Sequence, residues 1–409
     1  MNGRRGKDAM RKLAIIGASW LQAPLILRAK EMGLETHVFA WAANDIGERL
    51  ADRFYPISIT EKEEILSVCR DAGIAGVASI ASDLAAVTVA YVAENLGLTG
   101  NGNRSAFLAS NKRAMREAFA RHGDPSPRSL PVKTAAEVAA AGLAYPIIIK
   151  PTDRSGSRGI TRLETPEGLP EAIARAAGQG FEGAVLAEEF APGAEYSVEG
   201  LSWRGEHRML AITKKFTTGA PHFIETGHLQ PAPLDAGTAA RVRDTVFHAL
   251  DSLEIRVGAS HAELKIAPDG AIRLIEIGAR MGGDLIGSDL VPESTGVDYV
   301  GEVIRCALGE TPLLFRREHG CGGDEDGTAA EWNPLPPARR AAAVRFIFGE
   351  DDLRVLSRLK AERPELLVRE EVQPVTERAV TDSSSRFGAF VMHAPSAAEL
   401  MPWMPEEEM

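Results

Sequence analysis

The sequence predicts a mixed α/β and α+β fold, in which a parallel-sheet domain precedes antiparallel strands and hairpins. Three observations support this prediction. Short apolar strands alternate with helix-like stretches over residues 12–108, strand-like segments dominate residues 147–213, and an Asp269-Gly270 turn joins two alternating strands. Alternation of strands and helices is typical of a parallel sheet covered by helices. An Asp-Gly turn between alternating segments indicates an antiparallel hairpin.

The first domain is expected at residues 12–108, after a flexible tail at residues 1–11. Arg4 and Arg5 precede an apolar stretch, which could indicate a secretion signal. However, that stretch divides into a strand, a Gly17-Ala18-Ser19 turn and a helix-like segment, which is how a βα unit begins. Strands are expected at residues 13–16, 36–40 and 76–80, and helices at 61–71 and 84–96. The turn lacks the GxGxxG spacing of a dinucleotide site, so a nicotinamide or flavin role is disfavoured.

Three further segments follow this domain. A helix is expected from the N-cap Ser110 to a stop at Gly123. Strands are then expected at residues 147–150, 160–163, 184–190, 195–201 and 209–213, and a block at 238–309 combines a helix with the Asp-Gly hairpin. After a Gly- and Asp-rich link at 320–327, the sequence predicts a small α/β tail with strands near 344–348 and 388–392.

Composition restricts the class of function. The chain has 409 residues with 44% hydrophobic and 25% charged content, which is typical of a globular protein of several domains. A net charge of -11 without a Lys/Arg-rich run argues against nucleic acid or an anionic membrane and favours a small-molecule partner. Three widely spaced cysteines fit a reducing cytoplasm, and no run of 18 apolar residues predicts a membrane span.

The hairpin at residues 261–278 carries the most specific chemical signal. If its turn is centred on Asp269-Gly270, Glu263 lies directly opposite Glu276, and the other, buried face is shared by Ala262, Leu264, Ile275 and Ile277. Opposed like charges on a sheet are destabilising, so a cation is expected between the two carboxylates. Carboxylate oxygens suit Mg²⁺, which completes its shell with water and substrate phosphates. The alternative is that both glutamates are solvated surface residues.

A second signal is a buried strand that ends at Lys150 and leads into the loop Ser155-Gly156-Ser157-Arg158-Gly159. Glycines let a backbone approach a ligand closely, and successive N–H groups form a concave site for anionic oxygens. The loop therefore predicts a phosphate cover, although it is not a Walker A loop because the GxxxxGKS/T pattern is absent. A plain turn is the alternative.

A third signal is an apolar strand that ends in acids, Glu188-Glu189-Phe190-Ala191, followed by Glu195. Such a segment can offer backbone groups to an adenine edge and a carboxylate to ribose hydroxyls, but alone it is typical of an ordinary strand end. Lys214 and Lys215 are expected at a solvated strand edge. Arg386 is expected in a structural turn, with a contribution to the site as the alternative.

Taken in order, these elements resemble the ATP-grasp superfamily over nearly the whole chain, with the specific motifs between Lys112 and Asp284. The resemblance implies an ATP-grasp fold: a Rossmann-like domain at 12–108, ATP-binding lobes at 109–190 and 191–315, and a C-terminal α/β segment at 328–409. It implies ATP and Mg²⁺ as cofactors, with Mn²⁺ as an alternative cation.

The resemblance also assigns roles to residues. Lys112 and Lys150 correspond to the two lysines that contact ATP, and Ser155, Gly156, Ser157 and Gly159 belong to the phosphate loop. The adenine linker corresponds to Glu188, Glu189, Phe190 and Ala191, and Glu195 to the ribose-binding acid. Glu263 and Glu276 match the metal carboxylates, and Arg280 matches the arginine that neutralises the reacting groups. One departure is Gly278, where many members carry Asn; the hairpin places it opposite His261, and it could make room for the imidazole.

Within the superfamily, the segments 225–231 and 275–284 are similar to those of L-amino-acid ligases. By this resemblance His228 meets the acyl phosphate or the first carboxylate, and Glu225 meets the incoming amino group; a surface role for a His in a Gly-Pro loop is the alternative. The implied function is ATP-dependent joining of a carboxylate to an amine, with release of ADP and phosphate. A homodimer is implied as common for this enzyme type. The alternatives are a ligase for another biosynthetic acid and a nucleotide-binding module without catalysis.

Overall fold

The computed structural model describes residues 10–154, 156, 158–220, 223–316, 338–376, 380 and 382–406. Most of the expected N-terminal tail and the link at 320–327 lie outside these residues. The strands form three sheets, one of four parallel strands, one of four antiparallel strands and one of eight antiparallel strands. No helix in the described part of the chain is long and apolar enough to cross a membrane.

The N-terminal sheet confirms the predicted alternation of strands and helices. Its strands are parallel, in the order β3-β2-β1-β4, and comprise β1 (Lys12–Ile16), β2 (Glu35–Phe39), β3 (Arg53–Tyr55) and β4 (Gly76–Ala78). The connecting helices include α1 (Ala23–Glu31), α2 (Ile46–Leu50), α3 (Lys62–Ala72) and α4 (Asp83–Leu96). Helix α4 starts where it does because the hydroxyl of Ser82 accepts a hydrogen bond from the amide of Ala85.

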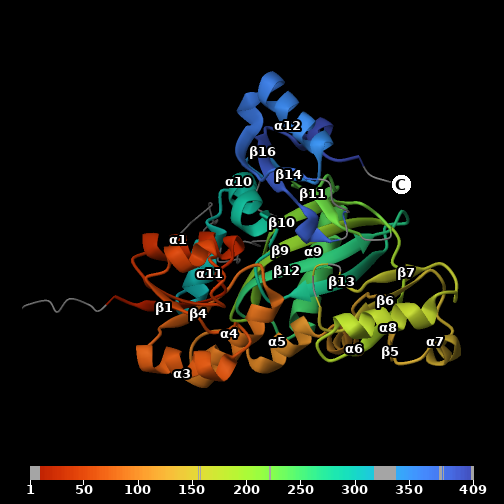
Figure 1. The fold of residues 1–409 in the computed structure, drawn as a ribbon, viewed down its shortest axis with the longest axis horizontal. Coiled ribbons are helices and arrows are strands. Elements are labelled where there is room, and N and C mark those ends of the chain that lie inside the picture. Colours follow the sequence, from red (N-terminus) through yellow and green to blue (C-terminus); the bar gives the residue numbers. More distant parts are fainter. Residues whose placement is uncertain are drawn as a thin grey trace, which may run out of the picture.

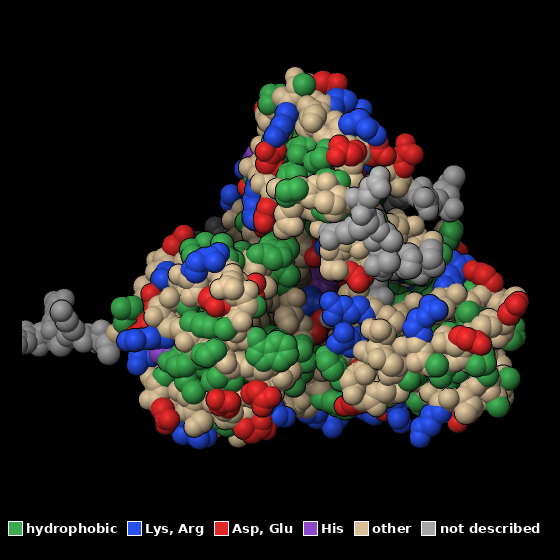
Figure 2. Space-filling model, in the orientation of Figure 1, with side chains coloured by type: hydrophobic (Ala, Val, Ile, Leu, Met, Phe, Trp, Pro, Cys, Tyr) green, Lys and Arg blue, Asp and Glu red, His purple; other side chains and the backbone are tan. Residues whose placement is uncertain are grey.

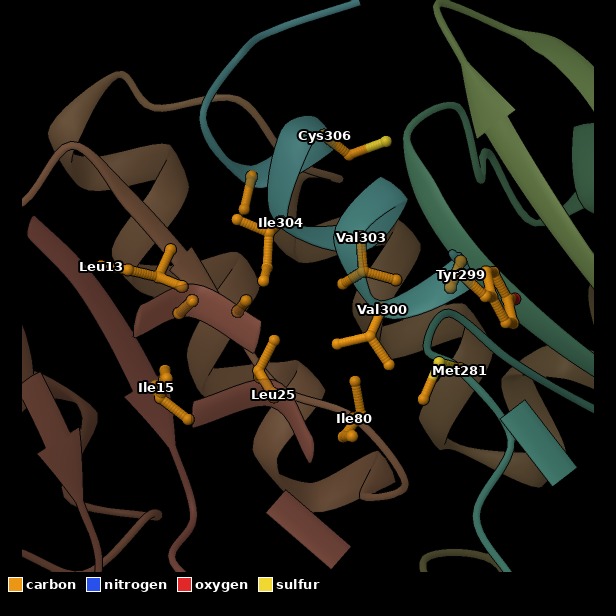
Figure 3. Packing of buried hydrophobic residues seen from close by; sticks show 14 of the residues in the cluster. Leu13, Ile15, Leu25, Ile80, Met281, Tyr299, Val300, Val303, Ile304 and Cys306 are labelled. Carbon is orange, nitrogen blue, oxygen red and sulfur yellow. The ribbon is translucent and has the colours of Figure 1, made fainter. Parts of the chain in front are cut away.

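One apolar core joins this sheet to a helix from much later in the chain. Helix α11 (Tyr299–Ala307) brings Val300, Val303 and Ile304 against Leu13 of β1 and neighbouring residues of α1, and these side chains are buried (Figure 3). Burial of apolar surface of this kind is the main stabilising contribution to a fold. The sheet predicted at residues 12–108 therefore shares its core with a helix outside that range.

The first lobe is built on the sheet β5-β8-β6-β7, which consists of β5 (Ser129–Val132), β8 (Val185–Glu189), β6 (Ile147–Pro151) and β7 (Thr161–Leu163). Helices α6 (Lys112–His122), α7 (Ala135–Ala141) and α8 (Leu169–Gln179) accompany it. The predicted start of α6 is wrong by one residue. Ser110 ends the preceding helix α5 (Asn103–Ser110), and Asn111 caps α6 by accepting from the amide of Ala114 at 3.1 Å.

The eight-stranded sheet is the centre of the molecule, and the other parts surround it (Figure 1). Its order is β13-β12-β9-β10-β11-β14-β16-β15, with α9 (Ala236–Ser252) packed beside it. The strands are β9 (Ala194–Trp203), β10 (Glu206–Thr217), β11 (Glu225–Gln230), β12 (Gly258–Ile266), β13 (Ile272–Gly278), β14 (Ala341–Ile347), β15 (Leu367–Val372) and β16 (Gly388–Ala394). Because β14 pairs with β11, the C-terminal strands extend the sheet that carries the hairpin.

Candidate functional site

A pocket with a cavity volume of about 170 Å³ lies where these parts meet. The N-terminal domain contributes Asp83 to its lining, the first lobe contributes Lys112 and Lys150, and the large sheet contributes Glu263 and Glu276. Figure 2 shows basic, acidic and histidine side chains gathered in the hollow between these regions. Further lining residues include Pro127, Ile148, Arg154, Gly156, Glu188, Glu189, Phe190, Ala191, Glu195, Lys215, Phe223, Glu225, His261, Lys265, Ile275, Gly278 and Arg280.

The hairpin confirms the predicted pairing of Glu263 with Glu276, but its turn differs from the expected one. The amide of Ala267 donates to the carbonyl of Ala271 at 2.9 Å, so three residues form the loop, and Gly270 takes the left-handed conformation that such a turn requires. This moves Leu264 opposite Leu274.

An irregularity in β13 then restores the register between Leu274 and Glu276. The prediction that Ile275 shares the buried face with Leu264 is therefore wrong. Ile275 lies in the irregular part of the strand and lines the pocket instead. A bulge of this kind turns one extra residue out of the ladder and re-aims its side chain.

Each hairpin carboxylate has a lysine partner. Lys215 donates to Glu263 at 2.9 Å, and Lys112 donates to Glu276 at 2.7 Å. Burial alone would raise the pKa of Glu263, but Lys215 and His261 hold that pKa well below its ordinary value. Among the described residues, no three His, Cys, Asp or Glu side chains converge to hold a metal. Two carboxylates that face each other beside an open pocket nevertheless fit Mg²⁺, which needs few protein ligands when phosphate oxygens and water complete its shell.

Lys150 lies at the centre of a buried charged cluster in the first lobe. Its ammonium donates to Glu188, and Arg116 also donates to Glu188 at 3.1 Å; all three side chains are about 4% exposed. Burial lowers the pKa of Lys150 to about 8, although the charge of Glu188 opposes this shift. Burial would raise the pKa of Glu188, but Arg116 and Lys150 hold it below its ordinary value.

Arg116 was not predicted from the sequence. It lies four residues after Lys112 on α6, so the two side chains share one helix face, and that spacing is the signal that could have identified it. Arg116 also donates to the carbonyl of Ile275 at 2.8 Å. The irregularity in β13 is therefore held by the first lobe.

Lys112 links the helix, the loop and the hairpin. It is the first residue of α6, and its ammonium donates to the carbonyl of Arg154 at 2.8 Å as well as to Glu276. Of the predicted phosphate loop, Gly156 lines the pocket, whereas Gly159 lies against Gln179. Ser155 and Ser157 lie outside the described residues.

The segment predicted to bind adenine contributes Glu189, Phe190 and Ala191 to the pocket lining. Phe190 and Ile148 both line the pocket, and the guanidinium of Arg162 lies 4.2 Å from the ring centroid of Phe190. Glu188 has its carboxylate directed to Lys150 and Arg116 rather than to open space. An apolar wall beside a backbone segment can accept a planar base.

Glu195, the predicted ribose-binding acid, is the second residue of β9 and also lines the pocket. Its carboxylate lies 2.8 Å from the ammonium of Lys215 and 3.8 Å from that of Lys265. Both lysines are on strands of the large sheet, so this acid is held on the second-lobe side of the pocket.

The expectation of a solvated edge for Lys214 and Lys215 is wrong. Strand β10 lies between β9 and β11, so it is no edge, and both lysines are buried. Lys215 contacts Glu195, Glu225 and Glu263 within 3.5 Å. Burial would lower the pKa of Lys215, but these three carboxylates raise it well above its ordinary value. Lys215 therefore keeps a positive charge in the pocket wall. Its position could not be predicted from the local sequence, because its three carboxylate partners lie on other strands of the sheet.

His228 lies in β11 and is 1% exposed, so the interpretation of this residue as part of a surface loop is wrong. Its Nε2 is 4.0 Å from a carboxylate oxygen of Asp284, which is too long for a hydrogen bond, and within the described structure neither ring nitrogen has a hydrogen-bond partner. Burial lowers the pKa of His228, although Asp284 opposes this shift. The ring packs edge-on against Phe346. His228 is not part of the pocket lining, whereas Glu225 on the same strand is.

The C-terminal segment contacts the site near Glu225 and His228 of β11. Arg386 follows the turn Ser383–Ser385, and its guanidinium lies 2.9 Å from Asp284, 3.5 Å from the carboxylate of Glu225 and 3.6 Å from the ring centroid of Phe346. The favoured interpretation of this segment as a structural turn is therefore incomplete, because its arginine contacts two acids of the site.

A buried layer behind the hairpin supports Glu263. His261 bonds to the fully buried Glu199 through Nδ1 and lies 3.3 Å from Glu263 through Nε2. Burial would lower the pKa of His261, but Glu199 raises it to about 9. Gly278 pairs with His261 as predicted, yet the space beside Gly278 holds Asp83 and Arg280 rather than the imidazole.

Comparisons with known proteins agree with this arrangement. Residues 143–289 match the family described as ATP-grasp domain. A D-alanine--D-alanine ligase of Nitratidesulfovibrio vulgaris is 30% identical over 220 residues, which cover 50% of this chain and 69% of that protein. The chain belongs to the ATP-grasp family. An alanine--anticapsin ligase of Bacillus subtilis is 29% identical to this ATP-grasp chain over 321 residues, or 68% of the chain, and the chain spans about 66% of that ligase's length.

Similarity to a solved structure covers almost the whole ATP-grasp chain. The crystal structure of an L-amino acid ligase from Bacillus licheniformis superposes with a TM-score of 0.78 and 24% sequence identity, covering 96% of this chain and 95% of that one. The predicted ATP-grasp fold is thereby confirmed.

Proposed function

We propose that this chain is an ATP-dependent ligase that activates a carboxylate as an acyl phosphate and joins it to an amine, with amino acids as substrates. One observation carries the proposal: Lys112, Lys150 and Arg280 converge on the same pocket as the facing carboxylates Glu263 and Glu276. A site that transfers a phosphoryl group mainly needs to position it and to neutralise its charge. This pocket provides cations from both lobes and two carboxylates for a divalent cation.

The nucleotide fits between the lobes. Phe190 and Ile148 offer an apolar wall for the base, and Glu195 offers a carboxylate to the ribose. Lys112 and Lys150 are paired with Glu276 and Glu188, and anionic phosphates can replace these carboxylates as lysine partners. When Lys112 turns to phosphate, Glu276 becomes available as a metal ligand beside Glu263. A bound Mg²⁺ would supply charge neutralisation at the phosphate oxygens.

The chemistry follows in two steps. An oxygen of the substrate carboxylate attacks the γ-phosphorus of ATP, and ADP leaves with the bridging electron pair. The amine nitrogen then attacks the acyl carbon, phosphate leaves with the oxygen that came from the carboxylate, and the amine loses a proton. Arg280 and Lys215 provide fixed positive charge for the oxygens that gain charge in these steps. No side chain of the enzyme has to form a covalent bond.

The substrate class is proposed from the end of the site near Glu225. The carboxylate of Glu225 lines the pocket and can receive an ammonium group, and His228, Asp284 and Arg386 lie close behind it. Mixed acidic and basic groups suit substrates that carry both an amino and a carboxylate group. The names of the relatives, alanine--anticapsin ligase and D-alanine--D-alanine ligase, support amino acids as the class.

A screen of ADP release, in which each amino acid is paired with a panel of amines, tests this proposal. We expect stimulation by at least one pair. In Glu276→Gln, ADP release should fall on the order of 100-fold or more, because a ligand of the divalent cation is lost. Glu370→Gln on β15 is the matched control, because Glu370 is exposed and, among the described residues, pairs only with Lys360. Full activity of Glu276→Gln would contradict the metal assignment, and stimulation only by other acids would indicate a different biosynthetic ligase.

A further inference from the structure

An ion pair joins the N-terminal domain to the end of the hairpin. Asp83 is the first residue of α4, and Arg280 follows β13 by two residues. Arg280 donates to Asp83 through Nε at 2.7 Å and through Nη2 at 3.0 Å, and the side chains are 14% and 16% exposed. Both residues line the pocket. Asp83 therefore lies within the site although it belongs to the N-terminal domain.

The backbone of the hairpin is shaped to admit this pair. A Cβ at position 278 would lie 2.7 Å from Oδ1 of Asp83 and 3.2 Å from Nε of Arg280, so only glycine leaves room for the pair at its present place. The amide of Ala81 also donates to the carbonyl of Met281 at 3.1 Å, which fixes the two segments to each other. The Asp83–Arg280 contact thus depends on both segments: Asp83 supplies the carboxylate, and Gly278 leaves the space that it occupies.

The pair uses only one edge of the guanidinium. Arginine has five N–H groups in a rigid planar fork, and Asp83 accepts from Nε and from one N–H of Nη2. A further N–H of Nη1 donates to the carbonyl of Met281 at 3.4 Å, a long contact. The remaining N–H groups of Nη1 and Nη2 have no protein partner in the described structure. Asp83 thereby fixes the plane of the guanidinium while its terminal edge stays available to a substrate oxygen.

We propose that Asp83 is a positioning residue that holds Arg280 in the orientation required to neutralise the reacting carboxylate and phosphoryl oxygens. This inference rests on the proposed ligase function. A fixed cation costs little reorganisation when charge develops, whereas a mobile arginine loses much of that benefit. The N-terminal domain is then a required part of the catalytic site, because it supplies the anion that orients the arginine.

The test compares Asp83→Asn and Asp83→Glu with the wild-type protein. An amide places a donor against one N–H of Arg280, so Asp83→Asn should release the guanidinium. We expect kcat/KM for the acid substrate to fall about 10- to 100-fold, with an unchanged KM for ATP, because misplacement of a catalytic group by about 1 Å has effects of this size. Asp83→Glu keeps the charge and should recover part of the loss.

A second ion pair between distant segments provides the matched control. Arg28 of α1 donates to Asp298 through Nε and Nη2, at 3.2, 3.1 and 2.7 Å, and neither residue lines the pocket. Arg28→Gln should leave both Michaelis constants and kcat unchanged. A loss of activity in Arg28→Gln equal to that of Asp83→Asn would show that any link to the N-terminal domain has the same effect, which would overturn the positioning role.

Gly278→Ala tests the same contact from the other side. Its Cβ would displace the carboxylate of Asp83, so its effect on kcat/KM should not add to that of Asp83→Asn in the double variant. A loss of kcat/KM in the double variant equal to the product of the two single losses would contradict the proposal. Wild-type kinetics in Asp83→Asn would also contradict it. Loss of ADP binding together with lower thermal stability would assign Asp83 a structural role and also overturn it. Failure of the ligase function itself would differ, because the wild-type protein would then release no ADP with any substrate pair.

Discussion

Charged side chains in the pocket wall hold one another in place before any substrate binds. Lys215 contacts Glu195, Glu225 and Glu263, and Lys112 contacts Glu276. Each ion pair limits the repulsion between neighbouring carboxylates at the cost of desolvating both partners. We therefore propose two roles for these lysines, one in stability without nucleotide and one in binding phosphate. These roles can be separated by substitution.

Lys215→Met should lower both activity and stability. Removing the ammonium leaves three partly buried carboxylates without their shared cation, so we expect the free energy of unfolding to fall by roughly 1–3 kcal/mol. Turnover should fall on the order of 100-fold, because a fixed positive charge near the reacting oxygens is lost. Urea unfolding and steady-state ADP release provide the two measurements.

Lys214→Met is the matched control for this prediction. Lys214 is adjacent on β10, is also buried, and does not line the pocket. Its substitution should leave turnover near the wild-type value. Equal loss of activity in both variants would show that Lys215 has no particular role in the site.

The lowered pKa of Lys150 leads us to expect that kcat/KM for ATP depends on pH. Burial lowers the pKa of its ammonium to about 8, so the group is charged below pH 8 and becomes neutral above it. The parameter kcat/KM for ATP, which reports groups of the free enzyme, should be constant below about pH 8 and fall as pH rises through that value. In Lys150→Arg the fall should be absent or shifted upward, because guanidinium stays charged. An identical fall in this variant would exclude Lys150 as its source.

At the scale of elements, the β12–β13 hairpin shows what a local pattern can predict. The pairing of Glu263 with Glu276 was predicted correctly, although the prediction assumed a turn centred on Asp269-Gly270; the actual three-residue loop shifts the register by one residue, and the irregularity in β13 restores it. The irregularity at Ile275 was not predicted, and the carbonyl of this residue accepts a hydrogen bond from Arg116, which lies on a helix of the first lobe. Interactions that a segment makes with distant parts of the chain are not encoded in its own periodicity.

The C-terminal segment supplies Arg386 to the site, and this also leads to a prediction. Arg386→Met removes the contacts with Asp284 and Glu225, so the KM of the amine or acid substrate should rise about tenfold while that of ATP is unchanged. Arg358→Met is the control, because Arg358 also lies over an aromatic ring, that of Trp403, away from the pocket. An altered KM for ATP alone would contradict this assignment.

At the scale of the whole molecule, the sequence predicted the order of the segments and the ATP-grasp fold. It did not predict that β14, β15 and β16 continue the central sheet, that α11 completes the N-terminal core, or that Asp83 reaches Arg280. These contacts join residues far apart in the chain, and no local period specifies them. The boundaries at 108, 190 and 315 and the roles of the individual site residues remain predictions.

If the chain forms an acyl phosphate from a carboxylate, one carboxylate oxygen must be transferred to the released phosphate. The acid substrate is labelled with ¹⁸O in its carboxylate, and the released phosphate is examined by mass spectrometry after a single turnover with ATP and an amine. We expect one ¹⁸O atom in each phosphate, ADP as the nucleotide product, and an amide bond between acid and amine. Unlabelled phosphate, or AMP with pyrophosphate, would contradict the formation of an acyl phosphate.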